Sequence, residues 1–511
     1  MAQPKIENKL KIVTQTPIQQ KLRNKIITAQ KWAEMVKSGD WINRGGPGSD
    51  SLPTMEALAA RFGKINNIEI WNNAIMLGNN FFAAADPEAK HHVLHEDFLL
   101  PTLRGLIKKG YKGMDWKHWG WSLGMDHNYA RFYRKDKAKR AHDWGVQACA
   151  VPEAGYVNGS YGVNNFMITA KSCKKFVCEI RDDYAWCEQG RGMNLPIDDV
   201  DYFVEVDTSQ EKYQWMSINE KAIKPDAIQT AIAKNCLSIM RDGDCIQVGI
   251  GALPTAVVIG LRNSGLRHIG VHSEMIGEYA FTLAEAGVCD NSRKTIDQGR
   301  CGWAYIMPVD TPRYYEWMHR NPFFAGFDIG YTNNVLTVSQ IDNMVTVNNF
   351  AQMDLRGQDA AGNVGGRPIS STGGQFQFTL GASMARGGRA ILAATSRDAK
   401  GRSRIVPMLE PGSVVAVPDW LVTYVCTEHG IVNLQGCTDA EKARKLISIA
   451  HPEDRPALEK AAVEKLNIKS DHWMFKTAPD RRFPTAAEMK DHKLGYMNVR
   501  VTPGQIAKEF D

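Results

Sequence analysis

The chain has 511 residues, of which 43% are hydrophobic and 23% charged, a composition typical of an ordinary globular protein. This length corresponds to two large domains or about three smaller ones. Lys and Arg outnumber Asp and Glu by only 62 to 56, an excess too small to argue for a nucleic-acid partner.

The cysteines and the apolar segments indicate the cellular compartment in which the protein is expected. The ten cysteines contain no CxxC pair and no regular spacing, which argues against a zinc site and fits a reducing environment. No run approaches the ~20 apolar residues that cross a bilayer, and the charged N-terminus lacks an apolar signal segment. We therefore expect a cytoplasmic protein with no membrane partner and no metal.

The first copy of a recurring pattern lies near the start of the chain. A Gly-Asp turn at residues 39–40 leads into a short strand and then into a glycine-rich turn at residues 45–48. A Leu-Pro pair follows, with a helical stretch over residues 54–62 and a strand over residues 68–71. This alternation of strand and helix is typical of a parallel α/β sheet.

The second copy repeats these parts in the same order about 200 residues later. A Gly-Asp turn at 243–244 precedes a strand, the glycine loop 249–251, a Leu-Pro pair, a helix over 255–263 and a strand over 269–272. Pro254 suits the first helical turn, where its missing N–H is not needed. The repeat predicts an α/β fold of two similar open domains with mostly parallel sheets.

A polar stretch that contains Lys-Pro, residues 212–226, is the predicted linker. It separates a first domain over residues 1–211 from a second over 227–470, which is followed by a polar, proline-punctuated tail over 471–511. Further expected elements are helices over 226–240, 439–450, 455–465 and 486–492, and strands over 414–418 and 422–426.

Glu274 follows the second-copy strand in the sequence Val-His-Ser-Glu-Met, about two dozen residues after the glycine loop. Backbone N–H groups of such a loop can bind an anion or a developing oxyanion, and a carboxylate beside them can act as a nucleophile. A plain surface glutamate is the alternative that spacing leaves open. The first copy has Ile70, Trp71 and Asn72 in this region, so the second half is the expected seat of chemistry.

Three more polar clusters are candidate ligand sites. Five glycines within residues 362–374 predict either a loop that cradles a phosphate or thioester, or a wide turn. Glu428 follows the strand that ends at Cys426, at the sheet edge where ligands bind, although a surface or capping charge would also fit. Asn348 and Asn349 could hydrogen-bond a carbonyl or carboxylate, or occupy a turn.

His91 and His95 are four residues apart, so a helix would place both on one face, where they could bind a metal. The order is not HExxH, because Glu96 follows the second histidine. We therefore expect a polar helix face here rather than a metal site.

Together, these motifs resemble those of the class I coenzyme A transferases of the acetyl-CoA hydrolase/transferase group, which includes 4-hydroxybutyrate, butyrate and succinate CoA-transferases. The resemblance extends from about residue 29 to about residue 462. Its motifs are GxGxxP at 249–254, HSEM at 272–275, MVTVN at 344–348, DLRGQ at 354–358, GGQ at 373–375, TEHG at 427–430 and ISIAHP at 447–452.

The resemblance implies an active site between the two domains and a covalent mechanism. Glu274 would attack an acyl-CoA, and a glutamyl-CoA thioester would then pass CoA to a carboxylic acid in a ping-pong reaction. Backbone N–H groups of Ile250 and Gly374 would stabilise the oxyanion, while Asn348 and Glu428 match family positions near the acyl group. The residues implied in CoA binding are Gly249, Ile250, Gly251, Ala252, Leu253, Gly373, Gly374 and Gln375.

The same resemblance implies an acyl-CoA donor and a carboxylate acceptor as partners, with CoA as substrate and covalent intermediate and no permanently bound cofactor. It also implies a homodimer or homotetramer. The chain departs from the family at Gln377, where Asp is common, and at His429, where Tyr or Gln is common. A tryptophan-rich segment, residues 114–121, could be core or could shape an acyl pocket. These features leave the glutamate chemistry intact and the substrates open.

Two other functions use much of the same machinery: an acyl-CoA hydrolase, in which water resolves the intermediate, and a catalytically silent CoA-binding subunit. A dinucleotide dehydrogenase is disfavoured, because Pro254 stands where GxGxxG requires its third glycine.

Overall fold

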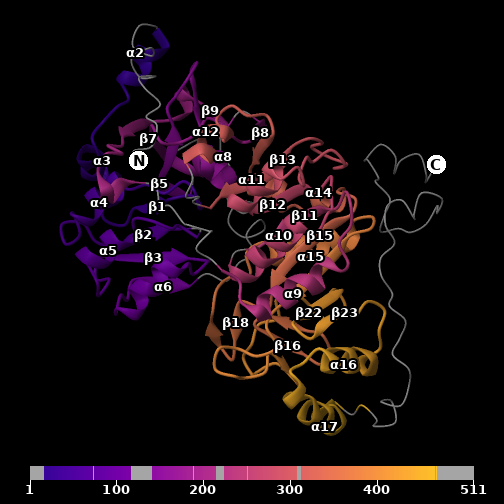
Figure 1. Ribbon diagram of the computed structural model, residues 1–511. Coiled ribbons are helices and arrows are strands. Elements are labelled where there is room, and N and C mark those ends of the chain that lie inside the picture. Colours follow the sequence, from indigo (N-terminus) through magenta and orange to yellow (C-terminus); the bar gives the residue numbers. More distant parts are fainter. Residues whose placement is uncertain are drawn as a thin grey trace, which may run out of the picture.

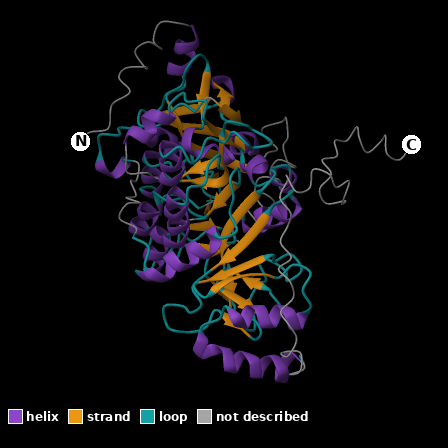
Figure 2. Cartoon of the chain, turned by 45° about the vertical axis from the view of Figure 1, so that its right-hand side comes forward, coloured by secondary structure: helices purple, strands orange, loops and turns teal. Residues whose placement is uncertain are grey.

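The computed structural model describes residues 17–72, 74–116, 138, 141–187, 189–214, 224–249, 251–307, 312–466 and 468. Two large β-sheets organise these residues, one built by the first half of the chain and the other mainly by the second half (Figure 1). Helices lie on both sides of the strands (Figure 2).

The first sheet has seven strands in the order β10-β7-β5-β1-β2-β3-β4, and every neighbouring pair is parallel. Its strands are β1 (Trp41–Asn43), β2 (Ile68–Trp71), β3 (His92–Glu96), β4 (Met114–Trp116), β5 (His142–Ala150), β7 (Cys173–Arg181) and β10 (Tyr202–Glu205). The other elements of this half are α2 (Pro17–Arg23), α3 (Ala29–Met35), α4 (Pro53–Ala59), α5 (Asn79–Ala85), α6 (Pro101–Lys108), α8 (Val163–Ser172) and the strand pair β6 (Tyr156–Asn158) and β9 (Asn194–Pro196).

The second sheet has nine strands in the order β23-β22-β20-β15-β11-β12-β13-β14-β8, and only β22 and β23 pair antiparallel. Its strands are β8 (Gln189–Arg191), β11 (Cys245–Val248), β12 (Gly270–Ile276), β13 (Cys301–Ile306), β14 (Phe324–Phe327), β15 (Met344–Asn349), β20 (Arg389–Ala393), β22 (Tyr424–Thr427) and β23 (Gly430–Asn433). Its helices are α9 (Ala227–Leu237), α10 (Ala252–Asn263), α11 (Glu278–Glu285), α12 (Pro312–Met318), α13 (Ile329–Thr332), α14 (Val335–Ser339) and α15 (Gln375–Met384).

The two sheets share one winding pattern. In the first, β1 is central, β2 to β4 extend the sheet on one side, and β5, β7 and β10 extend it on the other. In the second, β11 takes the central place, with β12 to β14 on one side and β15, β20 and β22 on the other. This doubly wound order confirms two similar open α/β units with mostly parallel sheets, as the sequence repeat predicts.

Strands that are covered on both faces are apolar along their whole length, and β13 follows this rule, since all its residues are buried. Beside the second sheet, α9 packs against α10, which also touches α11, while α13 contacts β12 and β13 and α15 contacts β15 and β20. Asp226 caps the N-terminus of α9 by accepting a hydrogen bond from the Gln229 backbone N–H at 2.7 Å, which explains where this helix begins.

The two halves are joined by more than the chain between them. Strand β8 comes from the first half yet pairs in parallel with β14 at the edge of the second sheet. Gly190 in β8 has a φ of +120°, and a Cβ there would collide with the carbonyl oxygen of Gly326. Helix α8 packs against β5 and β7 of the first sheet and against β13 and β14 of the second. One of the apolar cores therefore contains residues of both halves, and the domain boundaries drawn from the sequence remain a prediction.

A smaller unit extends the second half at the lower end of Figure 1. It has its own apolar core and contains α16 (Asp439–Ser448) and α17 (Arg455–Leu466), separated by a 3₁₀ turn at Pro452–Asp454. These are the two helices and the proline turn expected from the sequence. Its short strands are β16 (Gln352–Asp354), β17 (Asp359–Ala360), β18 (Asn363–Val364), β19 (Arg367–Pro368) and β21 (Ile405–Val406).

Several expected elements differ in the structure. The strand expected over 414–418 is absent: Val414 and Val417 each form only an isolated bridge, with Asn363 and Asp359, because Pro411 and Pro418 flank too short an extended stretch. The helix expected around His91 and His95 is also wrong, because residues 92–96 form β3, with an alternating burial pattern that a strand produces.

Other expectations fall outside the described residues: the tail helix over 486–492, most of the linker, and Trp119 and Trp121 of the tryptophan-rich segment. Trp116 ends β4 and packs against the core of the first sheet. Among the described helices none has the length and apolarity needed to span a bilayer. All ten cysteines are free thiols, and nine are buried.

Candidate active site

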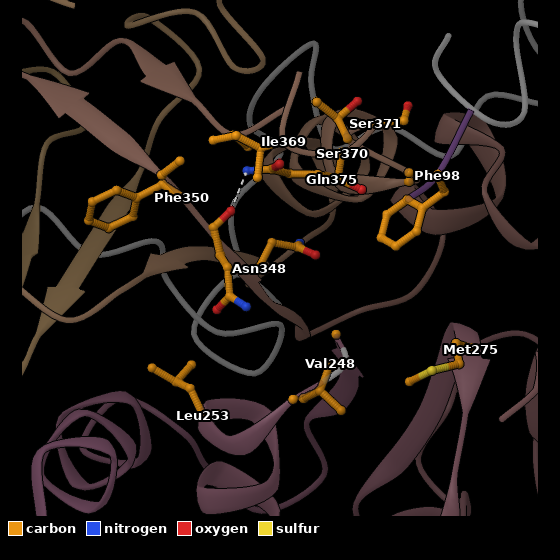
Figure 3. Close-up of a pocket in the computed structure, with 18 of the residues that line it drawn as sticks. Phe98, Val248, Leu253, Met275, Asn348, Phe350, Ile369, Ser370, Ser371 and Gln375 are labelled. Carbon is orange, nitrogen blue, oxygen red and sulfur yellow. Dashed lines mark hydrogen bonds between the residues drawn. The ribbon is translucent and has the colours of Figure 1, made fainter. Parts of the chain in front are cut away.

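A cavity of about 590 Å³ opens at the carboxyl ends of the central strands of the second sheet. In Figure 3, Phe98 and Met275 lie on one side of this cavity and Phe350 on the other. Carboxyl ends of parallel strands are where α/β sheets bind ligands. Residues from β11, β12, β15, β20 and the glycine-rich turn before α15 line the cavity, including Gln247, Val248, Gly249, Gly251, Leu253, Glu274, Met275, Asn348, Asn349, Thr372, Gly373, Gly374, Gln375, Ala394 and Thr395.

Glu274 lies within β12 rather than after it, because this strand runs to Ile276, beyond the expected end at residue 272. Pairing of β12 with β11 is confined to residues 270–271, whereas pairing with β13 continues to Ile276. The part of β12 that carries Glu274 has therefore separated from β11 just where the glycine loop follows β11. This opening lets the carboxylate line the cavity.

Two donors hold the Glu274 carboxylate. The Asn333 side-chain amide donates to its Oε2, and the Gly374 backbone N–H donates a second hydrogen bond. Burial raises the pKa of the Glu274 carboxyl to about 7, and these two hydrogen bonds only partly offset the effect of burial. Since a carboxylate with a raised pKa is less solvated and more basic, Glu274 is better suited to attack a carbonyl than a surface glutamate.

His272 fixes the residue that holds Glu274. It is fully buried, and burial lowers the pKa of its imidazole to about 3, so the ring is neutral. Its Nε2 lies 2.9 Å from the Thr332 carbonyl oxygen, which can only accept, so Nε2 carries the proton. Thr332 ends α13, and Asn333 is the next residue. His272 thus connects β12 to the turn that presents Asn333.

The Gly373–Gly374 turn must lack side chains to approach Glu274. A Cβ at Gly374 would collide with Glu274 Oε2 and with the Asn333 amide, and Gly373 has a φ of +54°. Across the cavity, Gly251 caps α10 with a φ of +116°, and a Cβ there would meet nothing within 4 Å. Gly374 is therefore required for close approach to Glu274, whereas Gly251 is required for its left-handed backbone conformation.

The Gln375 side chain, which follows the glycine turn, is held by two hydrogen bonds. Its Nε2 donates to Asp359 Oδ2 at 2.7 Å and to the Asn349 carbonyl at 3.3 Å. Burial raises the pKa of Asp359 well above its usual range, while the hydrogen bond from Gln375 acts in the opposite direction. This buried acid therefore fixes the start of α15, which carries the glycine turn.

The structure brings together most, but not all, of the residues expected from the sequence. Glu274, Asn348, Gly249, Gly251, Leu253, Gly373, Gly374 and Gln375 all line the cavity. Ala252 begins α10 and Glu428 accepts hydrogen bonds from the backbone N–H and hydroxyl of Ser396, and neither is among the lining residues. Ile250 lies outside the described residues.

Sequence reasoning missed four contributors. Asn333 and Asp359 stand far along the chain from the residues they hold, and no local pattern marks either one. Phe98 and Arg104 line the cavity from the first half of the chain, and only the expectation of a site between two domains could have pointed to that half.

Metal ligands do not gather anywhere in the part of the chain that the structure describes, where no three His, Cys, Asp or Glu side chains are placed to hold an ion. His91 and His95 are partnered separately. His91 Nδ1 lies 2.6 Å from Asn66 Oδ1, and His95 contacts Glu69 at 3.3 Å and Asp115 at 3.2 Å.

A doubly wound pair of units, with a partly buried carboxylate beside glycine amides in the second, defines the fold and site of an acyl-group or CoA-transferring enzyme. Models of the acetyl-CoA hydrolase/transferase N-terminal and C-terminal domains match residues 9–211 and 311–462. The chain belongs to this family.

The similar proteins support the same class. The chain is 32% identical to a probable butyrate:acetyl-CoA coenzyme A-transferase of Syntrophomonas wolfei, over 87% of this chain and 96% of that protein. It is 35% identical to a 4-hydroxybutyrate coenzyme A transferase of Clostridium kluyveri, over 61% and 70% of the two chains. The crystal structure of RipA from Yersinia pestis superimposes with a TM-score of 0.77 and 26% identity, covering 89% of this chain and 100% of that one. These relatives confirm the enzyme class predicted from the sequence, an acyl-CoA:carboxylate CoA-transferase.

Proposed function

We propose that this enzyme moves CoA from an acyl-CoA to a carboxylic acid through a thioester formed on Glu274. One observation carries the proposal: the Glu274 carboxylate lines the cavity and lies against the Gly373–Gly374 turn. A nucleophile and a main-chain N–H donor therefore share one spot, which is what an acyl transfer through an oxyanion requires.

The steps balance in atoms and charge. Glu274 attacks the thioester carbonyl, CoA leaves as a thiolate, and an acyl-glutamyl anhydride remains. The thiolate then attacks the glutamyl carbonyl, releasing the first carboxylate and leaving a glutamyl-CoA thioester. An acceptor carboxylate reverses this sequence and departs as the new acyl-CoA. Each addition places negative charge on a carbonyl oxygen, and the Gly374 N–H, which already donates to Glu274, is the donor that we assign to it.

The raised pKa of about 7 fits this role. Near neutral pH, a large share of the enzyme carries the ionised nucleophile, and the partly desolvated carboxylate is more basic than usual. Asn333 keeps the ionised form accessible and aims Oε2, while Asn348 lines the same cavity and exchanges hydrogen bonds with Gln247 at 3.1 and 3.2 Å. We assign Asn348 to the acyl group. Glu428 would need to move from Ser396 to reach a ligand.

Product analysis with trapping tests the proposal. Acyl-CoA donors are incubated with excess carboxylate acceptors, and both new acyl-CoA and free CoA are quantified. A transferase yields new acyl-CoA, whereas a hydrolase yields free CoA. Borohydride added during turnover should reduce the thioester on Glu274 to an alcohol, located by peptide mass spectrometry. Reduction at another residue, or none in an active enzyme, would refute the glutamyl route.

We further propose a cytoplasmic enzyme, which its scattered free thiols support, and a homodimer or homotetramer, which the family resemblance implies. Light scattering after size exclusion would measure the oligomeric state, and the same substrate panel would rank the acids.

A further inference from the structure

A second cavity adjoins the active site. Its volume is about 530 Å³, and it shares three lining residues with the active-site cavity: Ala351, Ile369 and Arg404. In Figure 3, Ile369 and Phe350 lie away from Met275, the neighbour of Glu274 on β12. Ile369, one of the three shared residues, therefore lies apart from Met275 on the strand that carries the nucleophile.

Arg404 is the charged residue of this wall, and it has an unusual environment. Its side chain is partly buried, and burial lowers the pKa of the guanidinium, while Asp398 acts in the opposite direction. Within the described residues, no carboxylate lies within 4 Å of this guanidinium. Its hydrogen bonds are to neutral oxygens: Nη1 donates to the Ala351 carbonyl at 3.2 Å, and Nε donates to Thr395 Oγ1 at 3.3 Å.

The two neighbouring arginines of the same segment differ from Arg404. Arg397 is paired with Glu453 and Asp454, and Arg402 is paired with Asp398 at 2.7 Å. Each is thus neutralised by the protein. A partly desolvated guanidinium is costly without an anion, so the unpaired Arg404 is best explained by an anion that arrives with a ligand.

The rest of the second cavity does not supply that anion. Glu410 lines it, but its Oε1 already accepts a hydrogen bond from the Gln352 amide at 2.6 Å. Asp398 accepts from the backbone N–H groups of Lys400 and Arg402. The remaining guanidinium donors of Arg404 are free to meet a ligand at the junction of the two cavities, where a planar, bidentate oxyanion would suit them.

We infer that Arg404 binds an oxyanion group of the substrate where the active-site cavity meets the second cavity. Two substrates carry such a group: an acyl chain with a second, distal carboxylate, and CoA through its phosphates. The inference rests on the proposed transfer through Glu274, because it assumes that an acyl-CoA occupies this cavity. Arg404 would determine which acids or which CoA forms bind, without taking part in bond making.

The test compares Arg404→Gln and Arg404→Lys with a matched control, Arg402→Gln, which removes an arginine of the second cavity that already has a protein partner. Donors are matched monocarboxylic and dicarboxylic acyl-CoAs of equal chain length, together with the same acyl groups on dephospho-CoA and on pantetheine. Circular dichroism checks each fold, and KM and kcat are measured separately.

Loss of one charge-assisted hydrogen-bonded pair is worth about 10- to 100-fold in KM. If the distal carboxylate is the ligand, Arg404→Gln raises KM by this factor for dicarboxylic substrates only. If a phosphate is the ligand, KM rises for every CoA thioester and not for pantetheine thioesters. Arg404→Lys should recover part of either loss, and Arg402→Gln should change KM less than about twofold.

Equal KM values in the wild type and Arg404→Gln across the whole panel would overturn the inference, as would an equal loss on substrates with and without the anionic group. Binding of CoA and of dicarboxylates to Glu274→Gln and to the Glu274→Gln/Arg404→Gln double variant, measured by calorimetry, gives a readout that needs no turnover. A missing thioester in the wild type would instead count against the Glu274 mechanism, so the two failures are distinguishable.

Discussion

The glycine loops that follow the central strands β1 and β11 occupy equivalent places in the two sheets, yet their surroundings differ, and the second lines the active-site cavity. In the first half, a Cβ at Gly45 would collide with Gln147, at Gly46 with Asn164, and at Gly48 with the Tyr161 carbonyl. In the second half, a Cβ at Gly251 would meet nothing within 4 Å, and one at Gly249 would meet only Pro254 and the Val347 carbonyl, both at 4.0 Å. Polar groups of the protein therefore fill the space beside the loop in the first copy, and the equivalent space in the second copy is open.

The helix starts behind these loops differ in the same way. Glu179 on β7 accepts hydrogen bonds from the Leu52 and Thr54 backbone N–H groups, both at 2.8 Å, at the N-terminus of α4. The protein's own carboxylate thus occupies the position where an anionic ligand would bind a helix. In the second half, the start of α10 faces the active-site cavity through Gly251 and Leu253. A substrate can therefore reach the helix start in the second half, whereas Glu179 occupies the equivalent position in the first half.

The largest expected effect separates the two carboxylates. Glu274→Gln should lower transfer by at least about 10³-fold while the protein stays folded, because it removes the nucleophile. The matched change in the first half, Glu179→Gln, should leave kcat unaltered and lower the free energy of unfolding by about 1–3 kcal/mol, because the amide keeps only one of the two oxygens that accept from the Leu52 and Thr54 backbone N–H groups. Steady-state kinetics and urea unfolding of both variants measure this contrast. Wild-type turnover by Glu274→Gln would remove the proposed nucleophile.

The glycines should divide in the same way. Gly374→Ala is expected to lower kcat by about 10²–10³-fold, because the new methyl displaces Glu274 and Asn333 and disturbs an N–H donor. Gly46→Ala in the filled loop should instead cost about 1–3 kcal/mol of stability through crowding against Asn164, with kcat per folded enzyme retained. Equal kcat in both variants would mean that the open loop has no catalytic role.

The pH dependence of stability offers a third contrast. Glu274 has a pKa of about 7 in the folded protein against an ordinary value of 4.5, so the unfolded chain ionises first. The contribution of the protonated Glu274 carboxyl to the free energy of unfolding is fully present below about pH 4.5. It is lost as the pH rises through about 7. Glu274→Gln should therefore be more stable than the wild type by up to about 3 kcal/mol at pH 8, and equally stable at pH 4. Thermal unfolding across this range would measure the difference, and a constant gap would contradict the raised pKa.

Asn333 should give the smallest effect of the four. Asn333→Ala is expected to lower kcat about tenfold, because one hydrogen bond that aims Oε2 is lost. That bond favours the ionised form, so its loss should also move the apparent pKa of kcat/KM upward from about 7. A pH–rate profile separates this role from simple destabilisation, which would lower the rate without moving the pKa.

Local signals were enough to predict much of this molecule. The repeated order of turn, strand, glycine loop, helix and strand predicted two similar sheets, and the carboxylate found in only one copy directed attention to Glu274. Residues 68–71 form β2 as expected, and α10 begins only three residues earlier than expected, because Pro254 is tolerated in its first turn.

Long-range features escaped prediction for a physical reason. Asn333 and Asp359 act through contacts with residues 59 and 16 positions away, which periodicity cannot reveal. Residues 91–95 suggested a helix because histidine spacing is compatible with either period, and the parallel pairing with β2 decided for a strand. The separation of β12 from β11 beside Glu274 depends on how three strands pair, so no single segment encodes it.

Strand β8 also constrains how the protein can assemble. This strand at residues 189–191 has its partner at residues 325–327, so the ribosome must add more than a hundred residues before the pairing can form. Until then, α8 lacks one of the two sheets that it contacts. A fragment cut at the linker would leave the outer edge of β14 without its neighbour, a surface prone to self-association. Separate expression of the two halves should therefore yield aggregates, and co-expression should rescue them only if β8 can insert after synthesis.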